Sequence, residues 1–213
     1  VNEGGVYCGN PALASGQKKT QGIGSSWNSD VFGNQTKGSV LQTFLIIGGQ
    51  AKVLTNTTKT FSVNSESVDV SGQEIGSEPG AGMVSMDGSW NQSEMTIHYD
   101  YDSETGLQKS QYGIGRGLSD DGFGNKTQSV TSQSYVKFGN QFKVAESKSY
   151  SWGTVKFDAY VGAHVEWRNN ALVEVTNWDL GAEPQQDQKS ADDSWNKNIM
   201  TTTYSYDNDK NSS

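Results

Sequence analysis

Acidic side chains at two places in the sequence have the spacing of a hard-cation site. Asp100, Asp102 and Glu104 occupy alternate positions, and Asp207 and Asp209 do the same near the end of the chain. Calcium prefers carboxylate oxygens, although both segments lack the central glycine and closing glutamate of the EF-hand loop. These acids are therefore candidate calcium ligands, with solvated charges at strand ends as the simpler interpretation.

Histidines and catalytic motifs give a weaker signal. His98 and His164 are the two histidines, and a histidine in an alternating strand is usually a surface or partly buried residue. The sequence has no Gly-x-Ser-x-Gly elbow, His-x-x-x-His pair, cysteine cluster or phosphate-binding glycine loop. Two carboxylates could act as acid and base on a sugar, but acids repeated along a chain are more simply turn residues. We predict no enzyme activity and no cofactor other than the calcium.

Four tryptophans are candidates for stacking on sugar rings. They lack an aromatic counterpart in the internal repeat of the chain or lie in its variable region, so we expect them to be exposed: Trp27, Trp152, Trp167 and Trp178. An aromatic ring offers an apolar face to a sugar, while Asn and Asp side chains bond the hydroxyl groups. These residues indicate a carbohydrate-binding or adhesive module.

Sequons and the first residue bear on location. Five Asn-x-Ser/Thr triplets are candidate glycosylation sites, although a chain rich in Asn, Ser and Thr also forms them by chance: Asn34, Asn56, Asn91, Asn125 and Asn211. The sequence starts at Val1, which we interpret as a processed or trimmed chain, most simply one that has lost a signal peptide. We therefore expect an extracellular or cell-surface protein.

Composition and charge disfavour two kinds of partner. The 213 residues carry a formal net charge of -8, whereas proteins that bind nucleic acid present a basic surface. The longest apolar run is residues 44–47, far short of the roughly 18 residues of a membrane-spanning helix. We expect neither nucleic acid as a partner nor a membrane-spanning segment.

An internal duplication is the strongest signal in the sequence. Residues 22–36 match residues 113–127 at eight of fifteen positions, and residues 87–102 match residues 192–207 at nine of sixteen. We therefore predict an N-terminal extension, a first unit and a second unit over residues 1–16, 17–107 and 108–213. The second unit is longer, and the added residues predict a hairpin near 145–178 that turns at 168–170.

Alternation of polar and apolar residues predicts strands throughout both units. The clearest runs are residues 39–46, 51–63, 134–138, 141–152, 154–161, 171–178 and 200–206. Gly-Gly, Gly-Asn, Asn-Asn and Asp-Gly pairs between them are typical of tight turns. We predict an all-β chain of about ten to fourteen strands, with two tandem copies of one unit built as an antiparallel sandwich or jelly-roll.

Glycines at matched positions indicate backbone that must stay free of side chains. Gly22 and Gly24 match Gly113 and Gly115, and a strand bend, a bulge or the close approach of another chain would each require this.

Three classes of function fit these features. The first is a secreted structural protein, a subunit of an extracellular filament, fimbria or biofilm matrix whose partners are copies of itself. Residues 1–16 would be the connector that adds a strand to a neighbour, through Val6, Tyr7 and Cys8. Cys8, the single cysteine, is then either paired with another chain or inert. The second class is the carbohydrate-binding module, and a third, a β-pore-forming toxin, is suggested by the Ser/Thr-rich residues 54–67.

Overall fold

The structure is a computed structural model that describes residues 20–31, 33–75, 78–80, 82–154, 165–168, 171–175, 189 and 194–206. Within them are ten strands and no helix: β1 (Thr20–Ser29), β2 (Gln35–Ile47), β3 (Gln50–Val63), β4 (Trp90–Tyr101), β5 (Gln108–Asp120), β6 (Lys126–Phe138), β7 (Gln141–Thr154), β8 (Val165–Arg168), β9 (Ala171–Val175) and β10 (Lys197–Thr203). The all-β prediction is confirmed. No helix in the described ranges is long and apolar enough to cross a membrane.

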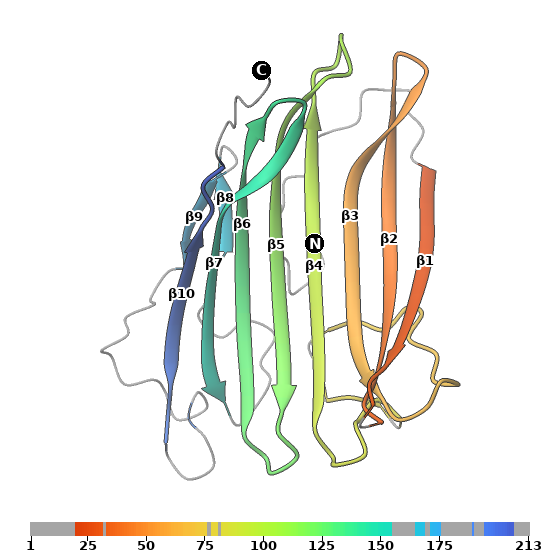
Figure 1. The fold of residues 1–213 in the computed structure, drawn as a ribbon, viewed down its shortest axis with the longest axis vertical. Coiled ribbons are helices and arrows are strands. Elements are labelled where there is room, and N and C mark those ends of the chain that lie inside the picture. Colours follow the sequence, from red (N-terminus) through yellow and green to blue (C-terminus); the bar gives the residue numbers. More distant parts are fainter. Residues whose placement is uncertain are drawn as a thin grey trace, which may run out of the picture.

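Eight of these strands form one antiparallel sheet in the order β1-β2-β3-β4-β5-β6-β7-β10. Figure 1 shows the sheet as a row of long strands with β1 at one edge and β10 at the other. β8 and β9 form a separate two-stranded sheet, where the added hairpin of the second unit was expected. The two packed sheets of a sandwich stay a prediction, because the described strands place only one large sheet.

Hydroxyl pairs between neighbouring strands explain how so polar a sequence forms this sheet. Thr43 and Thr55 approach to 2.6 Å between their Oγ1 atoms, and Thr57 and Thr96 to 2.9 Å. Cross-strand pairs of this kind each contribute a few tenths of a kcal/mol, up to about 1 kcal/mol. The sheet therefore needs fewer apolar residues than a fully buried one.

The turns after β1 and β5 use the same side-chain chemistry. The amide nitrogen and Nδ2 of Asn34 donate to the Asp30 carboxylate, both at 2.9 Å. Asn125 donates to Asp121 in the same way, at 3.2 and 2.6 Å. The duplicated acids Asp30 and Asp121 are therefore turn residues, as expected.

Strand registers in the two halves also agree. The register shifts between Thr43 and Phe44 in β2, and at the matching place between Ser134 and Tyr135 in β6. Near the other end of each half, a tyrosine hydroxyl donates to a valine carbonyl, Tyr101 to Val53 at 2.8 Å and Tyr206 to Val144 at 2.7 Å.

The main hydrophobic cluster lies where the connection between β3 and β4 packs on the sheet. Its members come from β3, from that connection, from β4 and from β5: Phe61, Val63, Val70, Ile75, Met83, Trp90 and Leu118. Leu118 belongs to the second predicted unit, so this core contains a side chain from each half. The β4–β5 junction is thus part of the core rather than a linker.

Candidate functional site

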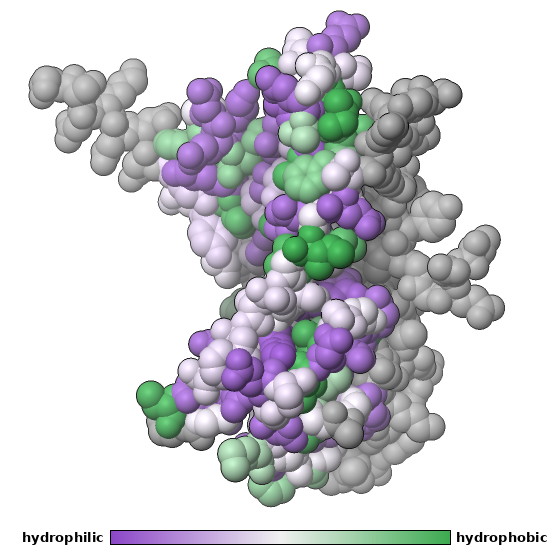
Figure 2. Space-filling model, turned by 90° about the vertical axis from the view of Figure 1, so that its right-hand side faces the viewer, coloured by the Kyte–Doolittle hydropathy of each residue, from purple (hydrophilic) through white to green (hydrophobic). Residues whose placement is uncertain are grey.

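β1 is an edge strand of the described sheet, and its own sequence lacks the usual protection against pairing. Its sequence, TQGIGSSWNS, has no charged residue and no proline, and nine of its ten residues are exposed. No described strand pairs with its outer side. Natural edge strands are normally short, bulged or charged. Figure 2 looks onto this side of the sheet and shows hydrophobic residues among the hydrophilic ones.

β5 has the same sequence pattern in a different environment. It pairs with β4 on one side and with β6 on the other, and Ile114 and Leu118 are only 9% and 7% exposed. Their counterparts on β1, Ile23 and Trp27, are 83% and 48% exposed. The main difference between the two strands is that β4 pairs with β5, whereas no described strand pairs with the outer side of β1.

The glycines of β5 make room for a side chain of β4. A Cβ atom on Gly115 would lie 2.8 Å from Cε of Met95 and 3.1 Å from the carbonyl oxygen of Glu94. On Gly113 it would lie 3.2 Å from Oε1 and 3.3 Å from Cβ of Gln133 on β6, and 3.5 Å from Sδ of the same methionine. Groups of neighbouring strands in the same chain therefore approach these glycines, with Met95 the nearest, whereas the approach of another chain stays a prediction.

Polar and aromatic contacts complete the β4–β5 junction. Glu94 lies 3.6 Å from a guanidinium nitrogen of Arg116 and 3.7 Å from Nζ of Lys59. The rings of His98 and Tyr112 stack at 4.6 Å with 10° between their planes. Burial lowers the pKa of His98 from 6.5, so this histidine is a neutral packing residue, and nothing in the contacts marks it as a base.

β10 forms the other edge of the sheet and pairs with β7 on its inner side. Met200, in the middle of the strand, is 59% exposed, and Trp195, two residues before it begins, is 38% exposed. Their counterparts in the first half are Met95 and Trp90, and Trp90 is only 5% exposed. Both edges therefore expose apolar side chains whose counterparts lie at the internal junction.

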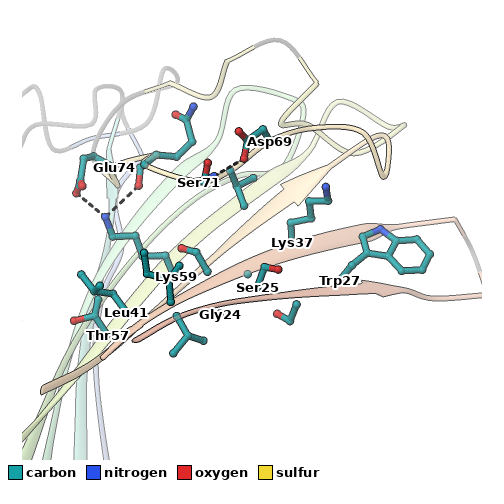
Figure 3. Close-up of a pocket in the computed structure, with 18 of the residues that line it drawn as sticks. Gly24, Ser25, Trp27, Lys37, Leu41, Thr57, Lys59, Asp69, Ser71 and Glu74 are labelled. Atoms are coloured by element: carbon teal, nitrogen blue, oxygen red, sulfur yellow. Dashed lines mark hydrogen bonds and ion pairs between the residues drawn. The ribbon is translucent and has the colours of Figure 1, made fainter. Parts of the chain in front are cut away.

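A groove of about 870 Å³ runs beside the open edge, between β1, β2 and β3 and the connection that follows β3. Lys37 donates to the Val68 carbonyl oxygen at 2.7 Å, and Lys59 forms an ion pair with Glu74 at 2.8 Å. Figure 3 shows Lys59 reaching Glu74 across the groove and Trp27 at its far end. The groove thus offers hydroxyls, charges and one aromatic ring to a polar ligand.

The other tryptophans predicted to bind sugars have different positions. Trp152 on β7 is 4% exposed, so the expectation of an exposed ring is wrong for this residue. It pairs with Lys197 in the way that Phe61 pairs with Gln92, and is therefore the core residue equivalent to Phe61. Trp167 lies on β8, whose side chains are not described, and Trp178 lies outside the described residues.

Asp102 already has hydrogen-bond partners. Its Oδ1 accepts from the backbone amides of Glu104 and Thr105 at 3.1 and 2.9 Å, and Oδ2 lies 3.2 Å from Nζ of Lys109. These contacts, that of the Thr105 amide first, hold the pKa of Asp102 well below its usual value. It is a turn acid in the described chain. Asp100 and Glu104 are exposed nearby.

Three or more potential metal-ligating side chains do not gather anywhere in the described ranges. Asp207 and Asp209 lie outside these ranges, so calcium at the predicted acids stays a prediction.

The sequons occupy turns and strands. Asn34 and Asn125 are exposed in the two aspartate turns, Asn91 is exposed on β4, and Asn56 is half-buried on β3. Asn211 lies outside the described residues, as do the assembly candidates Val6, Tyr7 and Cys8 and the histidine His164.

Sequence reasoning did not select Ile23, Trp195 or Met200 as candidate surface residues. Each of them repeats an identical residue at the matching position of the other half, and this repetition is the signal that could have identified them. Comparisons with known protein families, with curated proteins and with solved structures found no match. The function therefore has to be inferred from the two edges and the groove.

Proposed function

We propose that the protein is a secreted structural subunit that assembles with copies of itself, through β-strand contacts, into an extracellular filament, fimbria or biofilm matrix. The observation that carries this proposal is the open edge of β1. It has ten residues, no charge and no proline, and it displays Ile23 and Trp27. An unprotected edge is a template for another strand.

The exposed side chains supply a driving force for such pairing. Covering a residue of the size of Ile23 contributes about 2 kcal/mol, in addition to the backbone hydrogen bonds that a new strand would form. No described strand of the same chain pairs with the outer side of β1, so these groups are available to a partner strand. Assembly is therefore favoured wherever a partner strand of suitable pattern is present.

The duplication supports a subunit with two different ends. We propose that residues 17–107 and 108–213 are two copies of one unit, consistent with the equal registers and the equal turns of the two halves. Among the described strands, two copies in one sheet leave a first-unit edge and a second-unit edge unpaired. Contacts between unlike edges are heterologous, and they build open polymers wherever the rotation between subunits does not close a ring.

Light scattering on the purified full chain over a range of concentrations, with electron microscopy of the same samples, tests the proposal. We expect particles much larger than one chain. Ile23→Lys places a charge on the edge and should reduce assembly, whereas Val31→Lys is the matched control, because Val31 is 93% exposed in the turn after β1. A wild-type chain that stays monomeric contradicts the proposal.

The N-terminal residues 1–16 are proposed as an additional connector, through Val6, Tyr7 and Cys8. Their removal should shorten or abolish the polymers seen by electron microscopy. Filaments of normal length without these residues would reject the connector role and leave the edge of β1 as the site of assembly.

Carbohydrate binding is the second candidate, and the groove beside Trp27 favours it. Lysine, carboxylate and hydroxyl groups line the same groove, a mixture suited to sugar hydroxyls. A glycan array should then show selective binding that Trp27→Ala removes and Trp195→Ala, a change at the opposite edge, leaves intact. Binding that is unselective, or equal in both variants, rejects it.

A further inference from the structure

We infer that the partner of β1 is β10 of a second copy of this chain, paired antiparallel in the register that joins β4 to β5. This inference rests on the proposed self-assembly and names its surfaces. The chain already contains one example of the contact, because β4 ends the first half and β5 begins the second. The next copy would repeat the same step.

The internal registers support this extension. Phe61 pairs with Gln92 between β3 and β4, and their counterparts Trp152 and Lys197 pair between β7 and β10. The β1–β2 and β2–β3 pairings recur in β5–β6 and β6–β7 in the same way. The β4–β5 pairing has no equivalent among the described strands. Its equivalent would join β10 to β1 of another chain.

The register of the missing junction follows from the duplication. Met95 pairs with Gly115 and Glu94 with Arg116. Replacing each residue by its counterpart pairs Met200 with Gly24, and Ile199 with Ser25, across two molecules. A shift by one residue would turn every side chain to the wrong face, so the proposed register is specific.

Met200 and Gly24 are complementary in this register. Met95 lies over the glycines of β5, where a side chain on Gly115 would collide with it. On β1 a Cβ atom on Gly24 would come within 4 Å of one atom only, Cβ of Val40 at 3.7 Å. The space above Gly24 is therefore open, and the exposed Met200 of a neighbour has the same side chain that fills the equivalent space.

The aromatic side chains are complementary as well. Leu118 and Trp90 share the main hydrophobic cluster with Phe61, and their counterparts are Trp27, Trp195 and Trp152. Trp152 is buried, while Trp27 and Trp195 are exposed at opposite edges of one molecule. The contact would bring these two exposed rings, from different molecules, together at the position equivalent to that of Trp90 and Leu118 in the existing core.

Charge does not oppose the contact. β1 has no ionisable side chain, and β10 has one, Lys197. The Glu94–Arg116 ion pair of the internal junction becomes Ile199 beside Ser25, so the contact between molecules is neutral at this point. We expect its strength to depend little on salt.

Each added molecule would extend the sheet by eight strands. With strands about 4.8 Å apart, the subunit repeat along the sheet is about 38 Å, and twist makes the axial repeat shorter. We expect a repeat of this size in micrographs of ordered filaments.

Disulfide cross-linking of the full chain tests the register. In a Cys8→Ser background, Ser25→Cys with Ile199→Cys places two thiols at paired positions, whose Cα atoms would be about 5 Å apart, within the range of a disulfide. After oxidation with copper phenanthroline, a denaturing gel without reductant should show a ladder of covalent multimers. The matched control is Ser25→Cys with Asn198→Cys, one residue out of register.

The outcomes separate this inference from the proposed assembly. A ladder in the paired variant that is about tenfold weaker in the control supports the register, since the control places its thiols on opposite faces. Equal ladders, or none while light scattering still shows polymers, overturn the register and leave self-assembly standing. A chain that is monomeric on the gel and in light scattering overturns the register and the proposed self-assembly. An oxidised monomer with an internal disulfide shows that β10 pairs with β1 of the same chain, and this also overturns the inference.

Gly24→Val gives a second test that needs no cysteine. The added side chain fills the space assigned to Met200 of the neighbour, and β1 has no other described strand on that side. Light scattering should show about a tenfold rise in the concentration needed for assembly, equivalent to about 1.4 kcal/mol. A circular dichroism spectrum equal to that of the wild type shows that the chain still folds, and unchanged assembly in such a folded variant overturns the inference.

Discussion

β1 and β5 carry the same motif at the starts of the two halves, yet one is an open edge and the other lies inside the sheet. Ile114 is 9% exposed and Ile23 is 83% exposed. The two strands pair in the same register with β2 and β6 respectively. This sequence pattern is therefore suited to burial between two strands, and no described strand takes the place of β4 beside β1.

The largest expected difference is between Leu118→Ala and Trp27→Ala. Leu118 packs in the main cluster, so its truncation should lower the free energy of unfolding by about 2–5 kcal/mol. Trp27 is half-exposed at the edge, and its truncation should change the stability of the dilute chain by no more than about 0.5 kcal/mol. Urea unfolding followed by circular dichroism measures both. Equal losses would show that β1 is buried in the isolated chain.

A smaller difference is expected between Gly115→Ala and Gly24→Ala. The new methyl group at position 115 meets Met95 and the backbone oxygen of Glu94, so the variant should lose about 1–3 kcal/mol of stability. At position 24 the methyl group has ordinary contacts, and reduced freedom of the unfolded chain should stabilise it by up to about 1 kcal/mol. Thermal unfolding of the two variants gives the sign of each change. A loss at position 24 in dilute solution would contradict the comparison.

The smallest expected effect is the pH dependence of the internal junction. Burial lowers the pKa of His98 from 6.5, so the unfolded chain binds a proton at higher pH than the folded chain does. Stability should therefore fall as the pH drops below 6.5 and towards the lower pKa of the folded state.

His98→Thr, which copies Thr203 of the second half, should flatten this dependence. Melting temperatures from neutral pH to about pH 5 measure it, a range in which His98 titrates and the turn carboxylates stay ionised, since hydrogen bonds lower the pKa of Asp102 and Asp121 further. An unchanged slope in the variant would assign the effect to other groups.

Much of the fold follows from local pattern. Residues 39–46, 51–63, 134–138 and 141–152 alternate clearly and lie in β2, β3, β6 and β7. The sequence pattern did not identify β1, β4 and β5 as strands. Gly, Ser and Asn weaken the alternation in β1 and β5, and polar residues dominate β4. Glycine is unfavourable in a strand by itself, and only the approach of Met95 to Gly115 explains its presence there.

The candidate site was less predictable. Trp152 was expected to be exposed because no aromatic residue matched it in the aligned segments, whereas its spatial equivalent is Phe61, which is fully buried. Trp27 was selected as an exposed sugar-stacking residue, but its relation to Trp195 depends on which strands lie at the edges. Alignment alone carries no information on which side of a strand is unpaired.

The sequence by itself determined the class of the fold and the chemistry of its turns, since alternation and the Asp–Asn turn residues act between near neighbours in the chain. The tertiary structure decided which copies of a repeated residue are buried. Burial depends on strands that are distant in sequence, and no described strand lies beyond β1 or β10, the two ends of the sheet. Matching local patterns therefore become core in β5 and exposed surface in β1.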